Sequence, residues 1–153
     1  MISKHITPAE AFKSQSAIRH GIDNTTTNEV ILANMRHVAE LFEQIRAHFG
    51  IPIGISSFYR SAALNKKIGG AKNSQHTLGE AIDIDADIYG GVTNKEIFEF
   101  AKTLDFDQLI FEGQKANGDA EWIHISRKKK GKNKKQILKA TFTGKGVSYT
   151  NLI

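Results

Sequence analysis

The chain has 153 residues, of which 40% are hydrophobic and 24% charged, so it can form one folded core and is not of the disordered class. It has a net charge of +5 and no cysteine, which excludes disulfides, thiolate metal sites and cysteine nucleophiles. No apolar run approaches the roughly 18 residues of a membrane span, and the N-terminus lacks the features of a signal peptide. We therefore expect a single domain over residues 1–153, made in the cytoplasm.

The first third of the sequence predicts two helices. Thr7-Pro8-Ala9-Glu10 combines an N-cap, a proline at the first helical position and a capping glutamate, so we expect a helix from Pro8 to Ile18. A longer helix is predicted over residues 28–49, because apolar residues recur every three or four positions and Gly50 follows. The apolar positions, expected to face the core, are Ile31, Met35, Val38, Phe42, Ile45 and Phe49.

The remaining elements are shorter and mostly strands. Strands are expected over residues 51–56, 80–87, 108–112 and 122–126, with an edge strand over 136–142. Ser61 and Thr93 are N-cap candidates for helices that end near Ile68 and Leu104. Helices followed mainly by strands predict an α+β fold in which an antiparallel sheet packs on the long helix.

The positive charge is concentrated in residues 127–135, which read RKKKGKNKK. This segment holds seven of the 21 basic residues and no acidic one, so the rest of the chain has 14 basic against 16 acidic residues. Such a run suits a polyanion, for example an anionic cell-wall polymer, or is a solvated loop. The lysines concerned are Lys128, Lys129, Lys130, Lys132, Lys134 and Lys135.

The segment from Ser74 to Asp83 contains the first two candidate metal ligands. His76 ends a loop, and Asp83 follows seven residues later within a predicted strand. Gly79 permits a sharp turn that brings the two side chains together. Imidazole and carboxylate are both zinc ligands. Alone, however, an aspartate on a strand is more often solvated or paired with a nearby cation.

A third candidate ligand, His124, lies in the strand predicted over 122–126. Strand alternation directs Ile123 and Ile125 toward the core and His124 toward the opposite face, where a site can lie. In a regular strand Glu121 would point away from His124, so both serve one site only if the strand begins after Glu121. A lone strand histidine is more often a hydrogen-bonded structural residue.

Together these residues resemble the M15 zinc peptidases. The string S-x-H-x-x-G-x-A-x-D is filled by Ser74, His76, Gly79, Ala81 and Asp83, and the later E-x-x-H by Glu121 and His124. The turn Phe58-Tyr59-Arg60-Ser61 is similar to the family's arginine motif, and the three motifs occur in the right order between about Ile51 and Ser126. Members of this family are D-alanyl-D-alanine carboxypeptidases and dipeptidases, and phage endolysins that cut the L-alanyl-D-glutamate bond.

The resemblance implies a hedgehog/D-Ala-D-Ala-peptidase-like fold and a role for each matched residue. His76, Asp83 and His124 would bind Zn²⁺, and three protein ligands leave one position open for water, as in catalytic zinc sites. Glu121 would be the catalytic base and Arg60 the cation near the scissile carbonyl. Ser74 would orient the loop or a substrate carboxylate.

We therefore expect a zinc peptidase that hydrolyses peptidoglycan stem peptides. An endolysin-type endopeptidase fits the small size, the basic segment and the lack of a signal peptide better than a D-Ala-D-Ala carboxypeptidase does. Such a protein would act on the cell wall after release or as a virion component. The alternatives are a zinc-binding wall-interaction module without activity, against which Glu121 and Arg60 count, and a polyanion-binding protein, which leaves the three motifs unexplained. Nucleic acid is not the expected partner.

Overall fold

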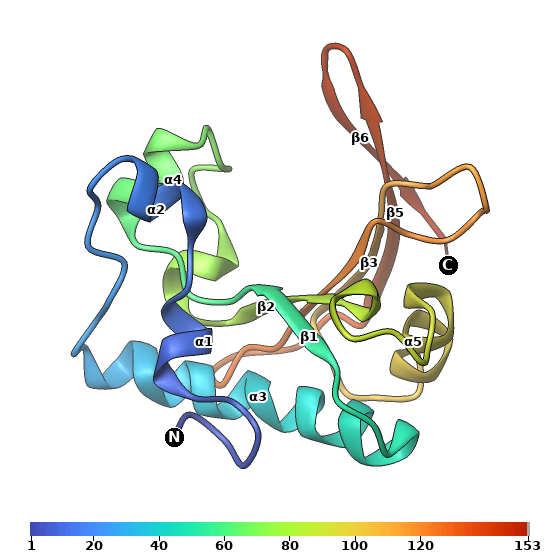
Figure 1. Ribbon diagram of the computed structural model, residues 1–153, viewed down its shortest axis with the longest axis horizontal. Coiled ribbons are helices and arrows are strands. Elements are labelled where there is room, and N and C mark those ends of the chain that lie inside the picture. The colour runs from blue at the N-terminus through green and yellow to red at the C-terminus, as the bar shows by residue number, and fades with distance from the viewer. Residues whose placement is uncertain (153) are drawn as a thin grey trace.

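The computed structural model describes residues 1–152, which form helices and one six-stranded sheet (Figure 1). The helices are α1 (Pro8–Phe12), α2 (Gln15–Arg19), α3 (Glu29–Phe49), α4 (Ala62–Lys67) and α5 (Asn94–Ala101), with 3₁₀ helices η1 (Gln75–Leu78) and η2 (Ala86–Ile88). The strands are β1 (Gly54–Ser57), β2 (Ala81–Asp85), β3 (Gln108–Glu112), β4 (Trp122–Ser126), β5 (Gln136–Thr143) and β6 (Gly146–Asn151). The predicted α+β class is confirmed. Within this part of the chain, no helix combines the length and apolar character needed to cross a bilayer.

The N-terminal helices differ from the prediction in one respect. The single helix expected from Pro8 to Ile18 is wrong, because the chain becomes extended at Lys13 (φ −62°, ψ 130°). Ser14 then starts α2, since its Oγ accepts a hydrogen bond from the backbone N–H of Ala17 at 3.1 Å. The helix predicted over 28–49 is confirmed as α3, which begins after the N-cap Asn28. Four of its six predicted core positions are buried, and Ile31 and Phe49 are partly buried against the core.

The sheet has the strand order β1-β2-β4-β3-β5-β6. Every neighbouring pair is antiparallel except β3 and β5, which run parallel, so the prediction of an antiparallel sheet is wrong at this pair. The chain leaves β4 at the end of the sheet where β3 begins, and β5 enters there, with Gln136 beside Gln108. The strand predicted over 136–142 is confirmed as β5, but its predicted position at the edge is wrong, because β6 pairs with β5 and takes the edge.

The two faces of the sheet have different roles. One face packs on α3 and α5 and forms the core. Its core residues on β2, β3 and β4 are Ile82, Ile84, Leu109, Phe111, Ile123 and Ile125. The opposite face carries Asp83 and His124 as directly paired residues of β2 and β4, and Ile110 beside His124 on β3. The β5–β6 hairpin extends this second face beyond the body of the molecule (Figure 1).

Candidate metal centre and active site

The structure brings His76, Asp83 and His124 together from η1, β2 and β4. One nitrogen or oxygen atom of each lies within 4.8 Å of the others. The Asp83 carboxylate is central, with Oδ2 at 3.3 Å from Nε2 of His76 and Oδ1 at 3.0 Å from Nδ1 of His124. His76 and Asp83 are buried, and the His124 side chain is only 12% exposed.

The backbone around His76 holds the imidazole in place. Ser74 is the N-cap of η1, and its Oγ accepts a hydrogen bond from the backbone N–H of His76 at 3.3 Å. Gly79 ends η1 with φ +72° and lies against α3, where a Cβ atom would be 2.7 Å from Cγ of Met35. The sharp turn expected at Gly79 is therefore confirmed, and any side chain there would displace η1.

The contacts of His76 create a need for a cation. Its Nδ1 lies 2.7 Å from the carbonyl oxygen of Phe58, which can only accept, so Nδ1 carries the hydrogen. On a neutral ring, Nε2 is then unprotonated, and its lone pair faces the Asp83 carboxylate. Two acceptors at this distance are stable only with a proton or a metal ion between them. The His₂Asp donor set, with one ring anchored on a backbone carbonyl, fits zinc.

Asp83 is kept ionised by its surroundings. In the metal-free site, with a proton between Nε2 of His76 and the carboxylate, burial raises the pKa of the Asp83 carboxyl, but the charge of His76 and hydrogen bonds from His124 and His76 outweigh burial. The pKa of Asp83 consequently lies well below its usual range. A carboxylate that stays ionised at any physiological pH suits a metal ligand.

The cluster lies in a cavity of about 520 Å³. The cavity is lined by Arg60, Ile68, Ala71, Asn73, Ser74, Gln75, His76, Asp83, Gln108, Ile110, Glu112, Trp122, His124, Phe142, Val147 and Tyr149. Polar side chains of the loop before η1 form one side, and apolar side chains of β4 and the β5–β6 hairpin form the other. This volume is that of a small-ligand pocket.

Arg60 is positioned at the cavity by two neighbours. Its backbone N–H donates to the carbonyl of His76 at 3.2 Å, and its Nη1 donates to Oδ1 of Asn65 at 3.1 Å. Burial lowers the pKa of Arg60 and the nearby Asp83 carboxylate raises it, and a guanidinium stays charged throughout. Asn65, buried on α4, also donates to the carbonyl of Ala71. Sequence analysis missed this buried amide, because asparagine has no distinctive pattern on a short helix.

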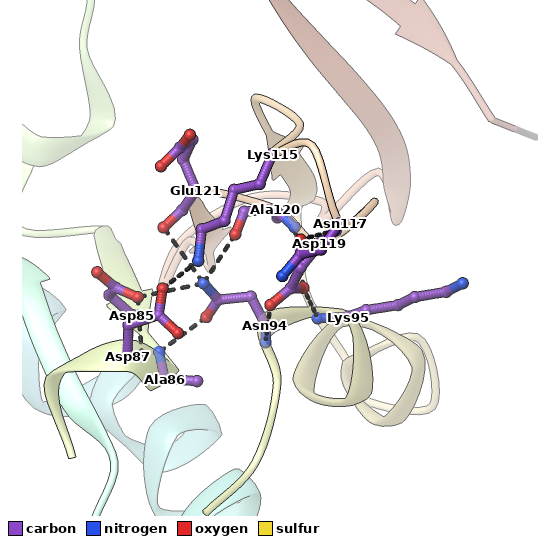
Figure 2. A network of polar contacts seen from close by, with 10 residues as sticks. All are labelled: Asp85, Ala86, Asp87, Asn94, Lys95, Lys115, Asn117, Asp119, Ala120 and Glu121. Carbon is purple, nitrogen blue, oxygen red and sulfur yellow. Dashed lines mark hydrogen bonds and ion pairs between the residues drawn. The ribbon is translucent and has the colours of Figure 1, made fainter. Parts of the chain in front are cut away.

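Glu121 lies outside the cavity that holds His76, Asp83 and His124. It precedes β4 as expected, but its side chain is exposed and does not line the cavity. Its Cγ lies over Gly113, where a Cβ atom would be 2.8 Å away. In Figure 2 the backbone carbonyl of Glu121 belongs to a polar network around Asn94, and the Glu121 carboxylate makes no hydrogen bond or ion pair with the residues drawn. There Nδ2 of the buried Asn94 donates to the carbonyl oxygens of Ala120 (3.0 Å) and Glu121 (3.2 Å), which fixes the backbone that leads into β4.

Glu112 occupies the position in the cavity that Glu121 was expected to take. It is buried at the end of β3 and pairs with Trp122, so its side chain is on the same face as His124. Burial raises the pKa of Glu112 to about 7, with His124 opposing and Asp83 adding to the shift. Sequence analysis missed Glu112. The available signal was the alternation of β3, which puts Ile110 and Glu112 on one face, but the pairing of β3 with β4 was not known.

The basic segment 127–135 forms a loop outside the cavity. Asp107 anchors it, because its Oδ1 accepts from the backbone N–H of Lys134 at 2.9 Å and lies 3.7 Å from Nζ of Lys128. Arg127 is paired with Glu40. Within residues 1–152, no ion pair involves Lys129, Lys130, Lys132 or Lys134, and all four are exposed. The loop therefore presents four solvated ammonium groups on an anchored backbone.

The chain matches the model of a known protein family. The family model described as Peptidase M15 matches residues 4–126. This span contains every residue of the cluster and both Glu112 and Glu121, and it ends with β4, so it leaves out the basic segment and the β5–β6 hairpin. A search of curated proteins found no significant match.

Proposed function

Because the chain belongs to the peptidase M15 family and is therefore a peptidase, we propose that it is a zinc metallopeptidase that hydrolyses the stem peptides of peptidoglycan. The observation that carries this proposal is the buried His76–Asp83–His124 cluster within a cavity open to substrate. The placement of α3 behind the site strand β2 supports a hedgehog/D-Ala-D-Ala-peptidase-like fold.

His76, Asp83 and His124 are the proposed zinc ligands. Zinc held there would supply Lewis acidity, which polarises a carbonyl oxygen and acidifies a water molecule. Phe58 fixes the tautomer of His76 through its carbonyl group, so that Nε2 is free to bind. Asp83 supplies the negative charge that a divalent cation requires, and because the pKa of its carboxyl is lowered, it is already ionised in the metal-free site.

We assign the general base to Glu112 in place of Glu121. Glu112 lines the cavity on the same face as His124, whereas the Glu121 side chain lies outside it. Glu112 would take the proton of the attacking water and deliver it to the leaving amine. Both carboxylates are in the chain, so the choice between them can be tested directly.

Arg60 is the proposed electrophilic residue. Its guanidinium is half-buried at the cavity and held by Asn65, so it is preorganised to stabilise negative charge as that charge develops on the carbonyl oxygen. Ser74 serves mainly to orient η1, because its Oγ is already engaged by the backbone of His76.

The choice of peptidoglycan, and of an endolysin-type endopeptidase over a carboxypeptidase, rests on the resemblance and on the basic segment. The four solvated lysines of 127–135 suit an anionic wall polymer. The protein would then meet the wall after release from the cytoplasm or within a virion.

Digestion of purified peptidoglycan tests this proposal. Wild-type protein supplied with zinc is expected to release peptides with a new N-terminal D-glutamate, detected by mass spectrometry, and chelation of the zinc should abolish their release. Free D-alanine as the sole product would establish the carboxypeptidase alternative. Absence of any new terminus, with zinc bound, would favour a non-catalytic module.

A further inference from the structure

One face of the β5–β6 hairpin is apolar: its inner residues Leu138 and Ala140 pack with Ile110 in a small second core cluster, and its outer residues lie outside any core. Phe142 of β5 pairs with Val147 of β6, and Ala140 pairs with Tyr149, so these side chains share a face. Phe142, Val147 and Tyr149 are 44%, 49% and 57% exposed. The opposite face of the hairpin carries polar residues, with Thr141 paired to Ser148 and Lys139 to Thr150.

This apolar face is continuous with the candidate active site. Phe142, Val147 and Tyr149 line the same cavity as the three metal ligands. The ring of Phe142 stacks on Trp122 of β4, with 5.3 Å between centroids. Trp122 is two residues from His124 on one strand, about 7 Å along the chain. These side chains form one surface that begins beside the His76–Asp83–His124 cluster and continues outward along the hairpin. We call this surface the hairpin wall (Trp122, Phe142, Val147 and Tyr149).

The hairpin wall has the chemistry of a ligand surface without charge. Contiguous apolar side chains that stay exposed beside a cavity are typical of a ligand-binding groove. None of its four residues is charged. Arg60 lies on the other side of the cavity, and the Glu112 carboxyl lies beside Trp122 on the same face of the sheet. Tyrosine and tryptophan combine a flat apolar ring with a hydrogen-bond donor. The occupant should therefore be neutral, flat and polar at its rim.

We propose that the hairpin wall binds a pyranose ring of the glycan strand to which the stem peptide is attached, an inference that rests on the proposed function. The C–H face of a pyranose packs on an aromatic face, and its hydroxyl and amide groups remain at the edge. The sugar ring is neutral, and it is joined to the N-terminal end of the stem peptide. The substrate would therefore run from the hairpin wall, across the proposed metal ligands, toward Arg60.

The distance along the substrate favours one scissile bond. Peptide spans at most about 3.6 Å per residue. If the L-alanyl-D-glutamate bond is the one cleaved, the sugar lies one residue and a short linker away from the scissile bond. This length is comparable with the spacing between His124 and Trp122. In a D-alanyl-D-alanine bond it lies about four residues away, past the start of the wall. The only side chain between the sugar and the first bond is a methyl group, too small to fill a surface of three aromatic rings.

A pair of substrates tests this proposal. The kcat/KM of the zinc-loaded full chain is measured on a stem peptide with an acetylated N-terminus and on the same peptide joined to N-acetylmuramic acid. We expect the muramyl peptide to be preferred at least tenfold. Tyr149→Ala should reduce that preference about tenfold through its kcat/KM on the muramyl peptide alone, and Tyr149→Phe should retain most of it, because the ring makes the contact. Thr150→Ala, on the opposite face of β6, is the matched control and should change neither value.

Binding can be followed without turnover, because Trp122 is the single tryptophan of the chain. In zinc-loaded Glu112→Gln protein, the muramyl peptide should change tryptophan fluorescence at concentrations at which the acetylated peptide does not. Equal losses on both substrates in Tyr149→Ala would place the peptide on the wall and overturn the sugar assignment. The sugar assignment would also be overturned if the protein showed neither a preference for the muramyl peptide nor a fluorescence response to it. If fluorescence responds to the muramyl peptide but the wild-type protein cleaves neither substrate, the proposed function is wrong, whereas sugar binding at the hairpin wall is supported.

Discussion

The two sides of the cavity are built in opposite ways. On the side of η1 and β2, polar side chains are buried and each is anchored: Phe58 holds His76, and both histidines hold Asp83. On the side of the β5–β6 hairpin, apolar side chains are exposed and are anchored only by strand pairing and by the stacking of Phe142 on Trp122. Catalysis requires side chains that are already held in position before the substrate binds. Recognition of a substrate requires an exposed surface that the substrate covers when it binds.

The family match follows the same division. It includes the anchored side completely and ends before the hairpin. The anchored side can therefore be discussed in terms of the family, whereas the hairpin has to be understood from this chain alone. Substitutions on the two sides should have different results. On the anchored side they should abolish metal binding and turnover, and on the hairpin they should reduce selectivity between substrates.

The largest effect is expected from the anchored side. His124→Ala removes one of three ligands and leaves Asp83 without one of its two partners, so zinc content should fall from about one per chain to near zero and hydrolysis should be lost. The stability that zinc binding lends to the fold should fall with it. Metal analysis and thermal unfolding measure both, with the exposed His20→Ala as the matched control. Full zinc occupancy in His124→Ala would show that the ligand set is wrong.

A smaller effect is expected from the titration of Glu112 in metal-free protein. Burial raises its folded pKa to about 7 from the usual 4.5, so the folded state binds this proton more tightly than the unfolded state does. The groups that face it electrostatically are His124, Asp83 and Tyr149. Glu112 therefore costs stability increasingly as the pH rises from about 4.5 to 7, and the full cost is present above pH 7.

Glu112→Gln should remove this cost. The variant is expected to be more stable than wild type above pH 7, by about 1 to 3 kcal/mol, and the difference should vanish toward pH 4. Denaturant unfolding of the two metal-free proteins at several pH values measures it. A difference that does not depend on pH would mean that Glu112 titrates normally and that burial does not affect its carboxyl group.

The smallest effect is expected outside the cavity. Changing Lys129, Lys130, Lys132 and Lys134 to Gln should weaken sedimentation with purified cell walls and flatten its dependence on salt, because exposed charges act over about 8 Å at physiological ionic strength. Turnover of a small soluble peptide should not change, since the loop does not line the cavity. Wall binding that survives the four changes would identify the segment as a solvated loop.

Much of the anchored side was predictable from local patterns. Alternation and capping residues predicted β3, β4 and the start of α5 at Thr93, and the ordered motifs indicated the residues that meet in the His76–Asp83–His124 cluster. These features depend on residues close together in sequence. The parallel pairing of β3 with β5 depends on where the chain re-enters the sheet after residue 135, which no local pattern contains.

The features that were missed depend on pairing between strands. β6 has only two apolar residues, Val147 and Tyr149, and none of its residues is buried, so its short alternation was not recognised as a strand, although β6 completes the sheet. Glu121 was favoured because it belongs to a short motif with His124. Glu112 is 12 residues from His124 in sequence and becomes its diagonal neighbour only through the register of β3 and β4.

The most direct test compares two variants, Glu112→Gln and Glu121→Gln, in zinc-loaded protein acting on one stem-peptide substrate. A general base typically contributes 10²- to 10⁴-fold, so kcat should fall by about that factor in Glu112→Gln, with the zinc content of the wild type. Glu121→Gln should retain kcat within a few-fold, because its side chain is outside the cavity. A large loss in Glu121→Gln together with near-normal turnover in Glu112→Gln would contradict this account of the active site.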